Sequence, residues 1–415
     1  MSVASPGRAT IPAAYKALAS ATIGLTLGFS SVGFASFGVF IIPLSETFGW
    51  GRGDISLAFT IMSYAAAAAV PFLGVIVDRF GVRRVLLPAM VAFGLVIGSL
   101  SFLSGNITQL YFAYLLVAIV GVGTSAPVYS RAIVRWFDKS RGLALGIGLS
   151  GIGLGAAIVP PIVQAAINYY GWQGGYLALA LLILAVTFPV CWLWLREPED
   201  VADDDEAVKG KIAPVTGHTL SQAVRLRTFW QMLISFTLLG IFTAGVMAHL
   251  VPLMRDRGAS VESAALAASL LGIALLIGRV FTGFLLDRFF APLVVAICLA
   301  AAAVGVAILA AGMQGIAVYV AIALMGFGIG AEIDFMAYLV SRYHGLLAYT
   351  RIYGIFYSLF LIGSGLGPLL MGYGQQTTGS YDLALLVLCI ITSAAIIPLA
   401  LLGRYPTFAT SMEGE

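Results

Sequence analysis

The sequence has few charged residues. Only 10% of its 415 residues are Asp, Glu, Lys or Arg, whereas 60% are hydrophobic and the mean hydropathy is +1.00. An ordinary soluble domain carries ~25% charged residues, so this chain has too few polar side chains to cover a surface exposed to water. The composition excludes a large soluble protein and predicts many membrane-spanning helices with lipid around them.

Potential metal ligands are also scarce. The chain has three cysteines, all within apolar runs, and three histidines, and neither set has metal-type spacing. No strand–turn–helix unit accompanies its many glycines, which excludes a nucleotide cradle, and no nucleophile–base pair lies within one region. The net charge of +3 is too small to indicate nucleic-acid binding. We therefore expect no metal, no cofactor, no nucleic-acid partner and no enzymatic activity.

Long apolar runs dominate the sequence instead. A helix needs ~20 mostly apolar residues to cross the hydrocarbon core, and lipid-exposed backbone must satisfy its hydrogen bonds within the helix. Twelve such runs are present, and they predict an all-α integral membrane protein. They lie near 17–43, 54–77, 84–104, 108–134, 142–167, 173–195, 228–252, 263–286, 291–311, 315–340, 350–372 and 381–403.

The basic residues predict the orientation. Of the 22 Lys and Arg, all but Arg52, Arg255, Arg257 and Arg279 fall on one side of the twelve spans, together with both termini. Basic residues accumulate on the cytoplasmic side of membrane proteins. We therefore expect a multi-pass protein of the plasma (inner) membrane with both termini in the cytoplasm.

One long hydrophilic segment divides the chain. Residues 196–227 predict a cytoplasmic linker between a six-helix half at 1–195 and a second at 228–415. The string GVIVDRFGVRR follows the second span and GFLLDRF follows the eighth, 209 residues later, while VRWF and SRYH are 207 residues apart. Two pairs of similar strings separated by nearly the same number of residues indicate a duplicated six-helix unit.

The repeated strings predict a conformational latch rather than a substrate site. Glycines allow close helix approach and a tight turn, the aspartate can accept hydrogen bonds from amides at a helix N-terminus, and the arginines can pair with it or with anionic lipid. The residues concerned are Gly74, Asp78, Arg79, Gly81 and Arg84 in the first string and Gly283, Asp287 and Arg288 in the second.

Together these features resemble the major facilitator superfamily over nearly the whole chain. Within it, FGVFIIPLSETFGWGRGDIS, RAIVRWFDKSRGLALGIGLSGIGLG and the arginine in LIGRVFTGFLLDR resemble the monocarboxylate transporter and oxalate/formate antiporter branch. The resemblance implies the major facilitator fold, two pseudo-symmetric six-helix halves with a substrate site between them near the membrane middle. It also implies that the arginine of the third string binds a substrate carboxylate.

The chain departs from the animal carriers of this branch at two positions. Animal monocarboxylate carriers have a lysine in the first span, whereas the first span here has no charge after Lys16. They also have an aspartate one turn before the span-8 arginine, where this chain has Leu275. The proton-coupling residue therefore cannot be taken from the family. A single buried cation favours a monocarboxylate over a dicarboxylate.

Arg279 is the residue most clearly marked for substrate binding. A charge at this depth costs ~2.5–3.5 kcal/mol on insertion scales, so it must face a cavity or a partner. Arginine stays charged and binds a carboxylate through two parallel hydrogen bonds. The alternative is a permanent ion pair with Asp334 or Glu332.

Glu332 and Asp334 are candidates for proton coupling, because carboxyl groups within spans are typical of proton relays. Two alternatives stay open. Both acids can be paired structurally with Arg131, Arg342 or Arg351, or the proton can compensate the charge of the substrate itself.

Five aromatic residues are further candidates for substrate contact. The hydroxyls of Tyr129, Tyr353 and Tyr357 can donate to a carboxylate, and Phe34 and Phe335 can form apolar walls. The alternative is that all five only pack helices together.

These features predict secondary active transport of a small organic monocarboxylate, lactate- or pyruvate-like, by proton symport and alternating access. The expected partners are the carboxylate substrate, protons and the lipid bilayer, and we expect a monomer. The alternative function is proton-coupled export of amphipathic compounds or drugs.

Overall fold

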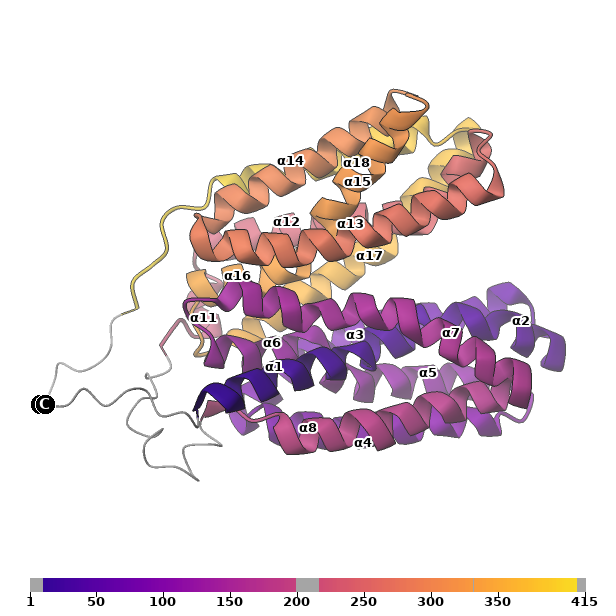
Figure 1. Ribbon diagram of the computed structural model, residues 1–415, viewed down its shortest axis with the longest axis horizontal. Helices are drawn as coiled ribbons and strands as arrows, with labels where there is room; N and C mark the ends of the chain where they lie inside the picture. The colour runs from indigo at the N-terminus through magenta and orange to yellow at the C-terminus, as the bar shows by residue number, and fades with distance from the viewer. Residues whose placement is uncertain (1–9, 199–215, 331, 409–415) are drawn as a thin grey trace, which may run out of the picture.

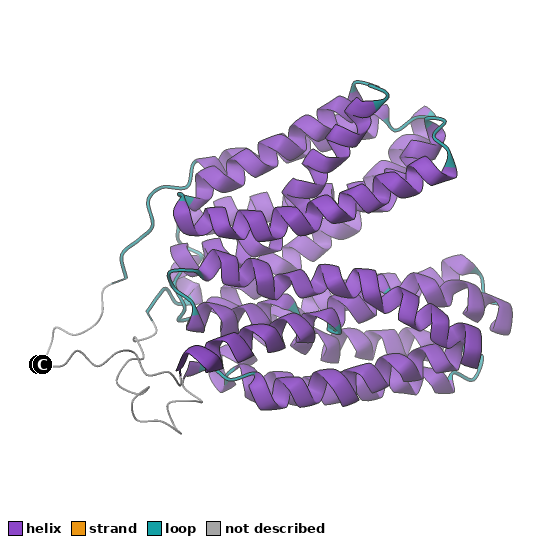
Figure 2. Ribbon diagram, viewed as in Figure 1, coloured by secondary structure: helices purple, strands orange, loops and turns teal. Residues whose placement is uncertain are grey.

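The computed structural model describes residues 10–198, 216–330 and 332–408. This part of the chain is almost entirely helical (Figure 2). The central portion of the expected linker, residues 199–215, lies outside the described residues.

The helices form two bundles that lie side by side (Figure 1). The N-terminal bundle comprises α1 (Thr10–Thr26), η1 (Ser30–Ala35), α2 (Phe37–Phe48), α3 (Arg52–Phe80), α4 (Val82–Ser99), η2 (Leu100–Phe102), α5 (Ile107–Gly121), η3 (Val122–Thr124), α6 (Ala126–Trp136), α7 (Arg141–Leu181), η4 (Leu182–Thr187) and α8 (Phe188–Trp194). The short helix α11 (Leu220–Ala223) leads into the C-terminal bundle, which comprises α12 (Arg227–Asp256), α13 (Val261–Arg288), α14 (Ala291–Ala310), α15 (Ile316–Gly330), α16 (Glu332–Tyr343), α17 (Tyr349–Thr378) and α18 (Asp382–Ala400).

The structure agrees with the predicted all-helical membrane fold. In the described residues, eleven helical stretches are long and apolar enough to cross a membrane, and one of them runs for 54 residues from Arg141 to Trp194. That stretch changes direction at Gly171, where φ is 72° and ψ is −179°. Glycine adopts this backbone conformation without a steric penalty. The long stretch therefore accounts for the fifth and sixth predicted spans.

Two spans of the N-terminal bundle are irregular where they meet. The first contains the π-helical turn η1, and the fourth passes from α5 through η3 to Ser125, which is extended (φ −93°, ψ 169°), before α6 begins. The backbone N–H of Phe29 donates to the Thr124 hydroxyl at 3.1 Å, so the irregular segments are joined to each other. Irregular backbone at membrane depth is tolerated only where protein or a cavity surrounds it.

The two bundles contact each other mainly through two pairs of crossing helices, α3 with α17 and α7 with α13, and α6 and α7 also contact α16. Both crossings rely on glycine. A Cβ atom at Gly74 would lie 2.6 Å from the Thr350 carbonyl oxygen, and one at Gly142 would collide with the Gly283 carbonyl. In Figure 1 the bundles meet at the end that carries α11 and the ends of the linker, called here the linker end, and diverge towards the opposite end.

The described end of the linker is attached to the loop between α16 and α17. The N–H of His218 donates to the His344 carbonyl at 2.8 Å, and the N–H of Leu346 donates to the Thr216 carbonyl at 2.8 Å. The His344 ring is fully buried against Phe229, with ring centroids 6.1 Å apart, and lies 5.9 Å from the His218 ring. The linker is thereby fixed a few residues before the N-terminus of α17.

This attachment predicts a dependence of stability on pH. Burial, with His218 beside it, lowers the pKa of His344 to about 4. An unfolded histidine titrates near 6.5 and therefore binds more protons than the folded one between pH ~6.5 and ~4, so stability falls as pH falls through this window, by up to about 3 kcal/mol. His344→Phe should flatten this dependence in melting curves recorded across that range. An unchanged slope would show that His344 is not its source.

Candidate functional site

Arg279 lies between the two bundles. Its side chain is 3% exposed, and its guanidinium donates from Nε to the Gly330 carbonyl at 2.7 Å and from Nη1 to the Leu149 carbonyl at 2.6 Å. Gly330 ends α15 of the C-terminal bundle, whereas Leu149 belongs to α7 of the N-terminal bundle. A single charged group therefore touches both bundles.

Two buried acids accompany this arginine. Asp334 Oδ2 lies 3.5 Å from Arg279 Nε, and neither carboxylate oxygen of Asp334 has a hydrogen-bond partner among the described residues. Glu332 accepts a hydrogen bond from the hydroxyl of Thr243 on α12. Both acids lie in the first turn of α16, where the helix dipole favours negative charge. The ion pair considered from the sequence is thus formed with Asp334.

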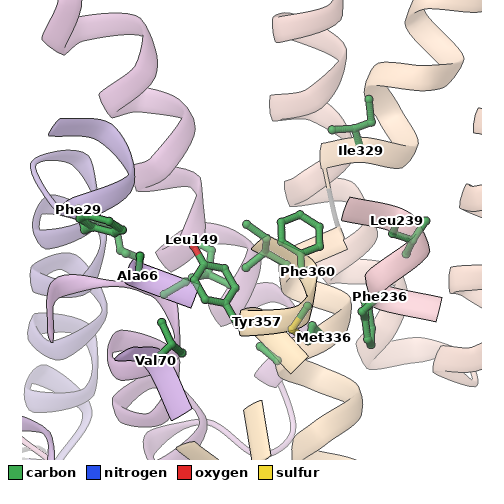
Figure 3. Close-up of a cluster of buried hydrophobic side chains, with 14 of the residues drawn as sticks. Phe29, Ala66, Val70, Leu149, Phe236, Leu239, Ile329, Met336, Tyr357 and Phe360 are labelled. Carbon is green, nitrogen blue, oxygen red and sulfur yellow. The ribbon is translucent and has the colours of Figure 1, made fainter. Parts of the chain in front are cut away.

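Tyr353 and Tyr357 lie near these charges, and Phe335 follows Asp334 on α16. The Tyr353 hydroxyl donates to the Ile333 carbonyl at 3.4 Å, and both tyrosines interact electrostatically with Arg279. Figure 3 shows Tyr357 projecting from α17 into the region between the bundles, where its hydroxyl hydrogen-bonds to Ser30 of η1. Phe335, the residue after Asp334 on α16, is fully buried. The structure therefore brings Tyr353 and Tyr357 to the same region as Arg279, whereas Phe335 is the neighbour of Asp334 on α16.

Tyr129 and Phe34 lie within the N-terminal bundle. The Tyr129 hydroxyl is 3.8 Å from Cys191 Sγ, and its ring fills the space beside Gly24. Phe34 makes edge-on ring contacts with Phe29 and Phe59, at centroid distances of 5.2 and 5.3 Å. The Tyr129 ring therefore packs α1 against α6 and α8, away from Arg279.

A second group of charges lies at the linker end, where α3 meets α17. Asp78 accepts hydrogen bonds from the backbone N–H of Thr350 at 3.2 Å and of Arg351 at 2.9 Å, at the N-terminus of α17, and forms an ion pair with Arg131. Arg131 also contacts Glu197 at 3.2 Å, and Glu197 accepts from the N–H of Val82 at 2.7 Å. This network joins α3, α4, α6 and the start of the linker to the C-terminal bundle.

The second repeat has the equivalent contact. Asp287 accepts hydrogen bonds from the backbone N–H of Gly142 at 2.6 Å and of Leu143 at 2.9 Å, at the N-terminus of α7. Each repeat therefore places its aspartate on the first amides of a helix in the opposite bundle, where partial positive charge is concentrated.

The arginines of the repeats have other neighbours. Arg79 lies over the Phe80 ring at 5.3 Å, Arg288 lies over the Phe284 ring at 4.1 Å, and Arg84 is exposed. The cation that pairs with Asp78 is thus Arg131 and not an arginine of the repeat. The sequence had indicated Arg131 as a partner for Glu332 or Asp334.

A family model described as the Major Facilitator Superfamily matches residues 23–368. The chain belongs to the major facilitator superfamily. Because this match spans most of the chain, the protein is a multi-pass membrane transporter of small molecules and not an enzyme.

Several members of the superfamily are similar in sequence. An uncharacterised transporter, YcxA of Bacillus subtilis, is 28% identical over 61% of this chain and 60% of its own length. Monocarboxylate transporter 13 of Bos taurus is 28% identical over 85% of this chain and 81% of its own. The oxalate:formate antiporter of Oxalobacter formigenes is 27% identical over 60% of this chain and 56% of its own. The chain thus spans little more than half the length of two of these relatives.

A solved structure of the same superfamily has the same fold. FucP, a fucose:proton symporter of E. coli, superposes with a TM-score of 0.69 over 92% of this chain and 97% of its own, at 14% identity. At this identity the likeness concerns the fold alone, and it supports the major facilitator arrangement of helices.

Proposed function

We propose that this major facilitator protein transports a small organic monocarboxylate together with a proton. The observation that carries the proposal is the position of Arg279, a permanently charged group that is almost fully buried and bonded to both bundles. Buried charges in membrane carriers mark substrate and ion pathways. Two relatives named as a monocarboxylate transporter and an oxalate:formate antiporter support a carboxylate as the substrate class.

The proposed coupling follows from the competition for this arginine. Asp334 contacts Arg279 only at 3.5 Å, and its oxygens have no hydrogen bond among the described residues. An incoming carboxylate can form two shorter, parallel bonds with the guanidinium and displace Asp334. The displaced acid would be left as an unpaired buried charge, so it takes up a proton. One proton then accompanies each carboxylate, and the net charge of the site does not change.

The proposed transport cycle moves the two halves, residues 1–195 and 228–415, against each other. The contacts of Asp78 and Asp287 hold the linker end closed in this structure. We infer that it represents an outward-facing state, with the linker end and both termini in the cytoplasm of a plasma-membrane protein, which acts as a monomer.

Thermal stability of the purified protein provides the test. Short monocarboxylates should raise its melting temperature, because a ligand of the folded state stabilises it by mass action, and Arg279→Ala should abolish the effect. Dicarboxylates, aromatic acids and lipophilic cations are included at two pH values. Stabilisation by lipophilic cations alone would instead support the export of amphipathic compounds.

The proposed latch predicts the effect of adding one methyl group at Gly74. Gly74→Ala places a Cβ 2.6 Å from the Thr350 carbonyl oxygen and so opposes closure at the linker end. Overpacking of this kind costs ~1–3 kcal/mol, which shifts the equilibrium towards the inward-facing state by roughly 5- to 150-fold. Distance measurements between spin labels at the two ends of the bundles report this shift. Gly38→Ala is the control, since no atom lies within 4 Å of its added Cβ, and equal populations in both variants would contradict the latch.

A further inference from the structure

An apolar groove runs along the outside of the crossing between α7 and α13. It has a volume of about 550 Å³ and is lined by Leu143 of α7 and by Leu276, Ile277, Val280, Phe281 and Phe284 of α13. Three of these six side chains are more than 40% exposed, and Phe284 is 37% exposed. The wall is thus made of apolar side chains from both bundles.

The length of the groove is close to the thickness of one membrane leaflet. From Leu276 to Phe284 the helix rises about 12 Å, while one leaflet contributes about half of the ~30 Å hydrocarbon core. The groove begins near the middle of α13 and ends one turn before the linker end of that helix. An acyl chain that entered at this end would follow it to the membrane middle.

Two basic side chains lie near the linker end of the groove. The guanidinium of Arg288 lies 4.1 Å over the ring of Phe284, the last lining residue, and Arg288 is exposed. Lys139, four residues before Leu143, is exposed as well. The nearby acids are engaged elsewhere, Asp138 by Arg141 and Arg342, and Asp287 by the amides of α7. This arrangement complements an anionic headgroup.

We propose that the groove binds an anionic phospholipid, with one acyl chain along α13 and the headgroup at Arg288 and Lys139. The site is shared by the two bundles, because Leu143 belongs to one and Phe284 to the other. The lipid therefore binds this closed arrangement of the linker end and stabilises it relative to the arrangement in which α7 and α13 separate. This consequence rests on the proposed transport cycle, in which lipid composition would then shift the population of the outward-facing state.

Native mass spectrometry of protein released from nanodiscs tests the site. The probes are phosphatidylglycerol and phosphatidylcholine with the same acyl chains. Wild-type protein should retain phosphatidylglycerol preferentially, and Arg288→Gln should reduce that preference about fivefold, as expected for the loss of one basic residue near anionic lipid. Arg225→Gln removes the same charge from an exposed position between α11 and α12, away from the groove, and should leave the preference unchanged.

Filling the groove provides a second, charge-independent variant. Val280→Trp places a large ring within the lining and should reduce retention of both lipids, whereas Ile297→Trp, on an exposed position of α14, should not. Equal retention of the two lipids by the wild type would overturn the proposal. So would full lipid retention by Val280→Trp, or a protein dimer, disrupted by that variant, in place of bound lipid.

Discussion

Arg279→Lys should weaken substrate binding by roughly 10- to 100-fold, the cost of losing one or two charge-assisted hydrogen bonds. The substitution keeps the positive charge but removes the planar group that donates in several directions. In the structure Nε and Nη1 reach the Gly330 and Leu149 carbonyls on opposite bundles. A lysine ammonium cannot reach both carbonyls and at the same time form two parallel hydrogen bonds with a carboxylate. Uptake of labelled monocarboxylate into proteoliposomes, measured over a range of concentrations, gives the change in apparent affinity.

The matched control for this experiment is Arg257→Lys. Arg257 also bonds to a carbonyl, that of Leu309, and pairs with an acid, Asp382, but it caps the C-terminal end of α12, the end away from the linker. Its replacement should leave uptake close to wild type. Wild-type affinity in Arg279→Lys would refute binding of the substrate carboxylate through two parallel hydrogen bonds, because a single positive charge would then be enough for binding.

Asp334→Asn should abolish accumulation driven by a pH gradient while preserving exchange. With one proton per carboxylate, a gradient of one pH unit supports about a tenfold concentration ratio. The amide cannot take up the proton, so the ratio should fall to one, whereas Arg279 stays available to substrate. The measurement compares uptake under an imposed pH gradient with counterflow of labelled against unlabelled substrate at equal pH.

Glu332→Gln is the comparison that identifies the acid. Glu332 already accepts a hydrogen bond from Thr243, whereas Asp334 is the acid paired with Arg279. We therefore expect Glu332→Gln to accumulate substrate and Asp334→Asn not to. If both variants accumulate substrate normally, neither acid carries the proton. If only Glu332→Gln fails, the coupling belongs to Glu332.

The fold was largely predictable from the sequence because membrane crossing requires long apolar runs. The twelve runs coincide with helices, and even the merged stretch at Gly171 contains two of them. The repeated aspartates were also recognisable, since a duplicated motif is visible as a fixed offset. The irregular turns at η1 and Ser125 were not predicted, because they depend on contacts between distant segments such as Phe29 and Thr124.

The partners of the charged residues were harder to predict. Glu197 follows the sixth span in a polar run, and nothing in the sequence distinguishes it from the other linker acids, yet it contacts Arg131 and the N-terminus of α4. Thr243 is one of several hydroxyl residues in apolar spans, and its contact with Glu332 depends on the packing of α12 against α16. Depth in the membrane can be estimated from sequence, but the direction of a side chain around its helix axis depends on tertiary packing.

The two aspartate contacts at the linker end bear on the speed of transport. Four backbone amides, two on α17 and two on α7, donate to carboxylates that belong to the opposite bundle. In the proposed cycle all four bonds break when the linker end opens, because each bundle holds two of the donors and the aspartate that accepts from the other two. Breaking these bonds adds to the barrier of the proposed conversion, even if both end states are equally stable. We therefore expect substitution of Asp78 or Asp287 to change the turnover number more than the affinity for the proposed carboxylate.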